Sequence, residues 1–134
     1  MKISIPHFKI VFFLLFICSN VCAQISESQQ HYLSGVRFSK QLRWDEAIGE
    51  YDLAIEKNNQ YVDAYIARAK AYQVRGMNEK AMQDYNMALK LNPSNVSVYD
   101  LRANLSMLMD NYTGAISDLN EAIRLNPKDS ITQI

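Results

Sequence analysis

Small, apolar and polar positions along this chain follow a pattern that returns every 34 residues. Ala47, Ala81 and Ala115 are spaced by this period, and Asn92-Pro93 returns as Asn126-Pro127. Between these marks, apolar residues recur at helical spacing and polar residues fill the remaining positions. A fixed period of this length is typical of helix-turn-helix arrays, in which each period supplies two antiparallel helices. The pattern therefore predicts six helices in three units, over 28–61, 62–95 and 96–129.

Capping and turn residues predict where individual helices begin and end. In the first unit we expect helices over about 29–41 and 45–57, with Asp45 capping the start of the second or stabilising it by its charge. Gly76 falls between the two helices of the second unit, where glycine easily adopts a positive φ. In the third unit Asp110 stands at this position. We expect its second helix over about 113–125, capped by Asn111 or Thr113.

Small residues predict the places where helices approach one another most closely. They lie on the second helices at Ala47, Ala81 and Ala115, and on the first helices at Gly35, Ala69 and Ala103. A larger side chain there would hold the helices apart, at a cost of roughly 1–3 kcal/mol. Aromatic residues at helical spacing are expected to fill the remaining core rather than to form a ligand box. These are Phe38, Tyr51, Tyr72 and Tyr85.

This combination of residues resembles the tetratricopeptide repeat family. The second unit is the most complete, with Tyr65, Ala69, Tyr72, Gly76, Ala81, Tyr85, Ala88 and Pro93. The first unit departs at its end, where Asn58-Asn59 replaces Asn-Pro. The third unit departs at Asp110, and at Ser106, where the family usually has an aromatic residue. The resemblance implies an all-α solenoid of three repeats and six antiparallel helices over 28–129.

In this family the first helices line a concave groove that holds extended peptides or partner helices. The resemblance therefore implies a groove formed by Tyr32, Val36, Ile66, Lys70, Gln73, Asp100, Asn104 and Met107. Chaperone-binding relatives clamp a terminal carboxylate with lysines, an arginine and asparagines, but Tyr32 and Val36 stand at two of those places. The alternative is that these eight side chains are only solvated.

The first 23 residues differ in kind from the rest of the chain. Lys2, His7 and Lys9 precede an apolar run over 10–18, and Val21-Cys22-Ala23 resembles a cleavage site. This layout is typical of a secretory signal peptide. The apolar run is shorter than the ~20 residues that span a bilayer, so membrane contact is expected only during export. We expect a periplasmic or secreted protein with a polar lead-in over 24–27. A lipoprotein signal, cleaved before Cys18 or Cys22, is a weaker alternative. The residues before these cysteines, Ile17 and Val21, are bulkier than those that lipoprotein signals normally have there.

Composition argues against catalysis and against electrostatic binding. Both cysteines lie within 1–23, and the rest of the chain has one histidine, His31. The chain lacks a glycine-rich phosphate loop and a nucleophile elbow, so we expect no enzyme, no cofactor and no metal. Glu46 with Glu50, and Asp118 with Glu121, are interpreted as solvated carboxylates. Without Lys2 and Lys9 the charge is near −2, and we expect no nucleic-acid partner.

The predicted function is that of a non-enzymatic protein–protein interaction module with a protein or peptide ligand. The alternative is a structural or assembly role, through self-association of repeat three or stacking on further repeats. A terminal repeat usually needs a polar cap, because its last helix has no successor to cover it. After residue 129 only 130–134 follow. We therefore expect uncovered apolar surface on the last helix, at Ile116, Leu119, Ile123 and Leu125.

We predict that signal peptidase cleaves after Ala23, because small side chains near the cut fit that enzyme. The exported chain would begin at Gln24 and contain no thiol. Intact-mass analysis of the exported protein measures this directly. Retention of Lys2, or a lipid on Cys22, would contradict it.

Overall fold

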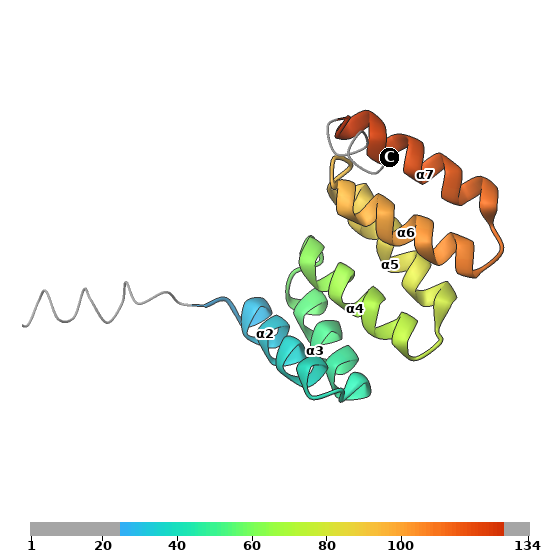
Figure 1. The fold of residues 1–134 in the computed structure, drawn as a ribbon. Helices are drawn as coiled ribbons and strands as arrows, with labels where there is room; N and C mark the ends of the chain where they lie inside the picture. Colours follow the sequence, from blue (N-terminus) through green and yellow to red (C-terminus); the bar gives the residue numbers. More distant parts are fainter. Residues whose placement is uncertain (1–24, 128–134) are drawn as a thin grey trace, which may run out of the picture.

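The computed structural model describes residues 25–127, which form six α-helices and no strand. They are α2 (Glu27–Lys40), α3 (Trp44–Lys57), α4 (Val62–Val74), α5 (Asn78–Leu91), α6 (Val96–Leu108) and α7 (Tyr112–Leu125). Three antiparallel pairs follow one another in chain order, from the blue α2 to the red α7 (Figure 1). The predicted all-α solenoid is confirmed. The predicted signal peptide and the tail over 130–134 lie outside the described residues.

Helices contact mainly their neighbours in sequence. The closest packing lies within the pairs α2/α3, α4/α5 and α6/α7, and the pairs are joined through α3/α4 and α5/α6. The first helices α2 and α4 also touch directly. This arrangement is quasi-one-dimensional, so each pair completes its buried surface against the next pair. None of the helices in the described part is long and apolar enough to cross a membrane.

The predicted small positions lie where helices meet. Ala47, Ala69, Ala81 and Ala103 are completely buried, and Ala115 is nearly so. Gly35 is also buried, and a Cβ atom there would lie 2.5 Å from Cε1 of Tyr51. That distance is too short for any side chain, so only glycine lets α2 approach this tyrosine ring.

The aromatic residues that were predicted to be core fill the spaces between these close approaches. Tyr51 and Tyr85 are buried, whereas Phe38 and Tyr72 are half-buried and pack against the core. The largest buried cluster extends from Tyr65 in the second repeat to Val98 and Leu105 in the third. Stacking of these repeats therefore forms one continuous core.

Two helix starts differ from the sequence-based expectation. The first helix, α2, begins at Glu27 because the Ser26 side chain accepts a hydrogen bond from the Gln29 N–H at 3.2 Å. That places the last residue of the predicted lead-in inside the helix. Of the two roles expected for Asp45, it does not cap α3, but it lies in the first turn, where an acidic side chain stabilises the helix start. Its carboxylate also pairs with Arg75, directly after α4, at 2.9 Å. Asn111 does cap α7, because its side chain accepts from the Gly114 N–H at 3.1 Å.

The turns inside the three repeats share one backbone conformation. Gly76 has a φ of +72°, as predicted, and its equivalents Leu42 and Asp110 have φ values of 60° and 58°. The left-handed conformation costs a residue with a Cβ atom roughly 1–2 kcal/mol. Leu42 is 72% exposed, so its side chain recovers little of this cost by packing. The turn geometry is thus imposed by the helix pair rather than by glycine.

Candidate binding surface

The eight predicted groove residues occupy equivalent positions on the three first helices. Ile66, Lys70 and Gln73 lie on α4 at i, i+4 and i+7, and so share one face of that helix. Asp100, Asn104 and Met107 repeat this stripe on α6, and Tyr32 and Val36 correspond to its first two positions on α2. We call these eight residues the first-helix stripe.

The exposure of the stripe increases from the first repeat to the third. Tyr32, Val36, Ile66 and Gln73 are half-buried. Lys70 and the three residues from α6, Asp100, Asn104 and Met107, are exposed. Neither Lys70 nor Asp100 forms an ion pair within the part of the chain that the structure describes. Both charges are therefore free to meet a ligand.

Tyr32 takes part in packing between helices. Its ring centroid lies 6.0 Å from that of Tyr51 on α3 and 5.1 Å from that of Tyr61, which precedes α4. Burial raises the pKa of Tyr32, and the neighbouring Asp63 carboxylate raises it further. Only part of this side chain can face a ligand, because the ring also joins three segments of the fold.

Gln73 is held by a buried tyrosine. The Tyr85 hydroxyl donates a hydrogen bond to Oε1 of Gln73 at 2.5 Å. Burial, together with the Asp84 carboxylate, raises the pKa of Tyr85 to about 12, so the hydroxyl remains a donor at neutral pH.

This tyrosine contact recurs in the first repeat and is lost in the third. The hydroxyls of Ser39 and Tyr51 lie 3.0 Å apart at the equivalent positions of the first repeat. The third repeat has Met107 and Leu119 there, and neither side chain can make a comparable bond. The third repeat therefore lacks the side-chain hydrogen bond that joins the first and second helices in the other two repeats.

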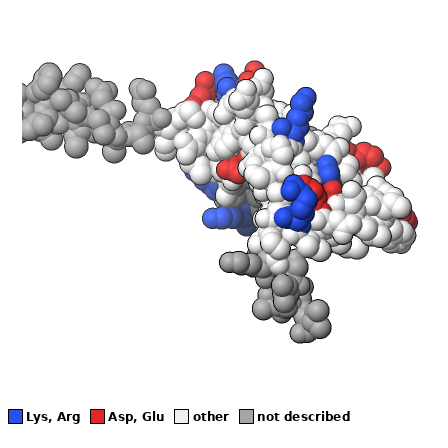
Figure 2. All heavy atoms as spheres, turned by 90° about the horizontal axis from the view of Figure 1, so that it is seen from above, with Lys and Arg blue, Asp and Glu red and all other residues white. Residues whose placement is uncertain are grey.

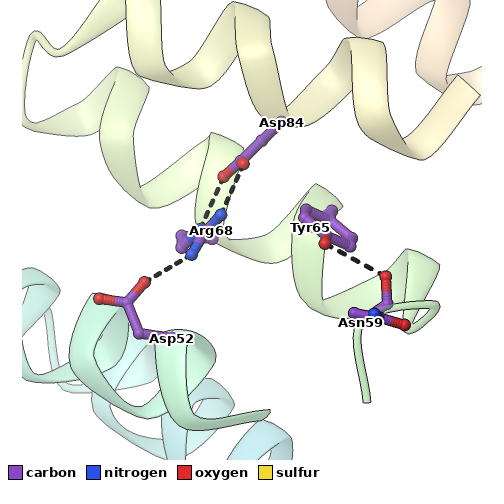
Figure 3. Close-up of polar contacts among 5 residues, drawn as sticks. All are labelled: Asp52, Asn59, Tyr65, Arg68 and Asp84. Carbon is purple, nitrogen blue, oxygen red and sulfur yellow. Dashed lines mark hydrogen bonds and ion pairs between the residues drawn. The ribbon is translucent and has the colours of Figure 1, made fainter. Parts of the chain in front are cut away.

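A charged contact that the sequence analysis missed holds the second repeat together (Figure 3). Arg68 of α4 donates from Nε and Nη2 to the two carboxylate oxygens of Asp84 on α5, at 2.8 and 2.7 Å. Its Nη1 donates to Asp52 on α3 at 2.6 Å. The side chain of Asp84 is 7% exposed and that of Arg68 is 18% exposed. One guanidinium therefore joins three helices.

The third repeat has the same contact. Arg102 of α6 donates to both oxygens of Asp118 on α7, at 2.8 and 2.6 Å, and to the Asn86 side chain on α5 at 2.7 Å. Hydrogen bonding to Asp118 raises the pKa of Arg102. Burial lowers the pKa of Arg68, but its bonds to Asp84 and Asp52 outweigh that effect, and its pKa is raised.

These contacts correct two interpretations made from the sequence. Asp118 is not a solvated carboxylate, because it is buried and paired with Arg102. Glu50 was also interpreted as solvated, but it is half-buried, and Nδ1 of His31 lies 2.8 Å from its carboxylate. Glu50 stands where the later repeats have Asp84 and Asp118. The 34-residue spacing of Arg68 and Arg102 is a signal that could have revealed the paired arginines.

Charged side chains of both signs occur on the face of the molecule drawn in Figure 2. On the face drawn in Figure 2, basic and acidic side chains lie within a large uncharged surface, with both signs side by side near its middle. Among the described residues, no three His, Cys, Asp or Glu side chains are grouped so that they could hold a metal ion.

Sequence models of the tetratricopeptide repeat match residues 62–95 and 96–129. The chain belongs to the tetratricopeptide repeat family. Tetratricopeptide repeat proteins are generally interaction modules, and this chain is a protein–protein interaction module. No curated protein matches the chain as a relative.

Solved structures show the same fold. The Arabidopsis OM64 TPR domain is 27% identical with a TM-score of 0.71, covering 75% of this chain and 84% of that domain. The first TPR of Spaghetti (RPAP3), bound to the HSP90 peptide SRMEEVD, is 25% identical with a TM-score of 0.70, covering 75% and 82%. MamA has a TM-score of 0.74 at 20% identity, and the match covers 77% of this chain and 60% of MamA.

We predict that Arg68→Met destabilises the protein by roughly 3 kcal/mol, because it leaves the buried Asp84 carboxylate without its partner. Adding Asp84→Leu should recover much of this loss, since the unpaired charge is then removed as well. Arg43→Met is the matched control: Arg43 is about half-exposed in its pair with Glu46, and its loss should cost less than about 1 kcal/mol. Urea unfolding measures all three changes. Equal losses for Arg68→Met and Arg43→Met would contradict the prediction.

Proposed function

We propose that this protein is an exported, non-enzymatic module that binds a peptide or a partner helix along the first-helix stripe. The observation that carries the proposal is the equivalent face of α4 and α6. Lys70 and Asn104 are exposed there at matching positions, and Asp100 is exposed one turn before Asn104. Within the described residues these three side chains take no part in ion pairs or in side-chain hydrogen bonds. The Spaghetti domain with its bound peptide supports a peptide as the class of ligand.

The chemistry of the stripe favours a mixed ligand. Val36 and Ile66 are half-buried, and together with Met107 they offer apolar surface. Lys70 and Asp100 add one charge of each sign. A ligand with apolar side chains, one acidic group and one basic group would complement this set. The acidic peptide SRMEEVD, which binds the Spaghetti domain, fits it less well because Lys70 is the one cation of the stripe.

Export and the absence of catalysis belong to the same proposal. Export rests on the basic, apolar and small-residue pattern of residues 1–23. His31 is the one histidine after that segment, and its contact with Glu50 ties α2 to α3. That contact gives His31 a role in the fold. The family's general use as an interaction module supports the same conclusion.

The test is a titration of the partner that co-purifies with the protein. We expect Ile66→Glu and Met107→Glu each to weaken binding at least tenfold, because each places a carboxylate in the apolar part of the contact. Gln83→Glu is the matched control, since it adds the same charge at an exposed position of α5 outside the stripe. Calorimetry gives the dissociation constants, and unfolding curves check that each variant is folded.

Either of two results would overturn the proposed binding surface. One is an equal loss for the stripe variants and for Gln83→Glu. The other is tight binding of SRMEEVD that none of the stripe variants weakens.

An assembly role is the second candidate, and one observation favours it. Ile116, Leu119 and Ile123 of α7 are 59%, 39% and 48% exposed. Their equivalents on α5 are Met82, Tyr85 and Leu89, which are half-buried or buried and pack at the junction with α6. The face of α7 therefore repeats the chemistry of a repeat-to-repeat interface. Its expected occupant is a helix of the same type, from a second copy or from further repeats.

If the α7 face mediates self-association, the sedimentation coefficient should rise with concentration over a hundredfold range. Leu119→Glu should abolish this rise, because it buries a carboxylate in the contact. Lys70→Glu, on α4, should leave the rise unchanged. A monomer at every concentration would exclude self-association through this face.

A further inference from the structure

A pocket of about 460 Å³ lies between the last helix of the second repeat and the two helices of the third. Met82 of α5, Arg102 and Ser106 of α6, and Gly114 and Ser117 of α7 are among its lining residues. Its volume falls within the ~300–1,000 Å³ that is usual for ligand sites. The pocket is therefore large enough to hold a bulky side chain.

The first two repeats have an aromatic ring where the third has Ser106. Tyr72 stands at the equivalent position of the second repeat, and Phe38 at that of the first. Two further positions are also smaller in the third repeat than in the second. Lys80 is replaced by Gly114, and Gln83 is replaced by Ser117. The loss of side-chain volume at three neighbouring positions accounts for the pocket.

The arginine contacts show what the third repeat lacks. The guanidinium carbon of Arg68 lies 5.6 Å from the ring centroid of Tyr65 and 5.7 Å from that of Tyr72. Arg102 has the first of these contacts, at 5.8 Å from Tyr99. At the second position Ser106 has no ring, and Arg102 lines the pocket. A ring entering the pocket would restore the second cation–π contact.

Two methionines make the pocket suitable for a ring from outside the chain. Met82 and Met109 both line it, whereas the equivalent residues one repeat earlier are Ile48 of the first repeat and Arg75 of the second. Thioether groups contact aromatic rings favourably, and their flexible side chains adjust to rings of different shape. The rim is polar, because Asn86, Asn111 and Ser117 are exposed there.

We propose that this pocket binds one aromatic side chain, preferably tyrosine, of a protein partner. The equivalent space of the second repeat is filled by a tyrosine side chain that packs in the same way. The polar rim can hydrogen-bond the main chain that carries the inserted ring. Tyrosine and arginine are also among the residue types that are enriched at the centres of protein interfaces.

The pocket and the first-helix stripe lie on opposite sides of α6. The stripe includes Asp100, Asn104 and Met107, whereas the pocket includes Arg102, Ser106 and Met109. A shift of two residues turns the direction of a side chain by roughly 200° around a helix. Both surfaces can therefore be occupied at the same time. If a ligand does not bind to one of them, binding to the other is still expected.

The test uses N-acetyl-tyrosine amide as the probe and N-acetyl-leucine amide as its non-aromatic control. Amide shifts of the isotope-labelled full chain locate each probe. We expect the tyrosine probe to bind on the order of millimolar, as is usual for one side chain, with shifts centred on Ser106, Asn111 and Gly114. The leucine probe should bind at least tenfold more weakly.

Two variants connect this binding to the pocket. Ser106→Tyr restores the residue of the second repeat, so it should fill the pocket, raise the melting temperature and weaken the tyrosine probe at least tenfold. Ser117→Gln restores the exposed residue at the rim and should weaken the probe several-fold without affecting folding. Lys70→Ala, on the stripe, is the matched control and should leave probe binding unchanged.

Several outcomes would overturn the proposal. These are equal binding of the leucine probe, shifts located elsewhere, or undiminished binding in Ser106→Tyr and Ser117→Gln. If phenol binds and the tyrosine amide does not, the site takes a free aromatic molecule rather than a side chain. If the pocket signals change with protein concentration and no probe, a second copy is the occupant.

Discussion

The contact on which this structure most depends is a guanidinium held between three helices. Arg68 forms a two-bond contact with Asp84 of α5 and a third bond with Asp52 of α3. A bidentate contact fixes the orientation of both groups as well as their distance. The helix α4 therefore cannot turn against α5 without breaking hydrogen bonds to a buried carboxylate. Ile66 and Lys70 lie on the opposite face of α4, so the same contact sets the direction in which they point.

The three repeats have different residues at the position of Arg68. The second and third repeats have an arginine–aspartate pair, whereas the first has Ser34 opposite Glu50. Glu50 is instead paired with His31, one helical turn earlier on α2. A carboxylate thus keeps a polar partner in each repeat, while the residue that supplies the partner changes. This is expected where a half-buried acidic group must keep a partner, because leaving it unpaired costs several kcal/mol.

The third repeat has more unused surface than the other two. The buried tyrosine of the earlier second helices is replaced by Leu119, which is 39% exposed. The aromatic residue of the earlier first helices is replaced by Ser106, which leaves a pocket beside Arg102. Met107 is exposed, whereas its equivalent in the second repeat, Gln73, accepts a hydrogen bond from Tyr85. Each change removes a contact that the chain makes with itself, and so leaves surface that a partner can cover.

The sequence by itself determined the helices, their pairing and the buried alanines, because these depend on a short pattern that is repeated three times. It also located the first-helix stripe by register, but only the tertiary structure decided which of its residues are free. Tyr32 and Gln73 are engaged by Tyr51 and Tyr85 from the facing helix. Likewise, Asp118 lies one helical turn before Glu121, which pairs with Arg124 of the same helix. Asp118 is buried instead, and its partner is Arg102 of α6, 16 residues away. Burial and charge pairing depend on which helices meet, and those neighbours are far apart in sequence.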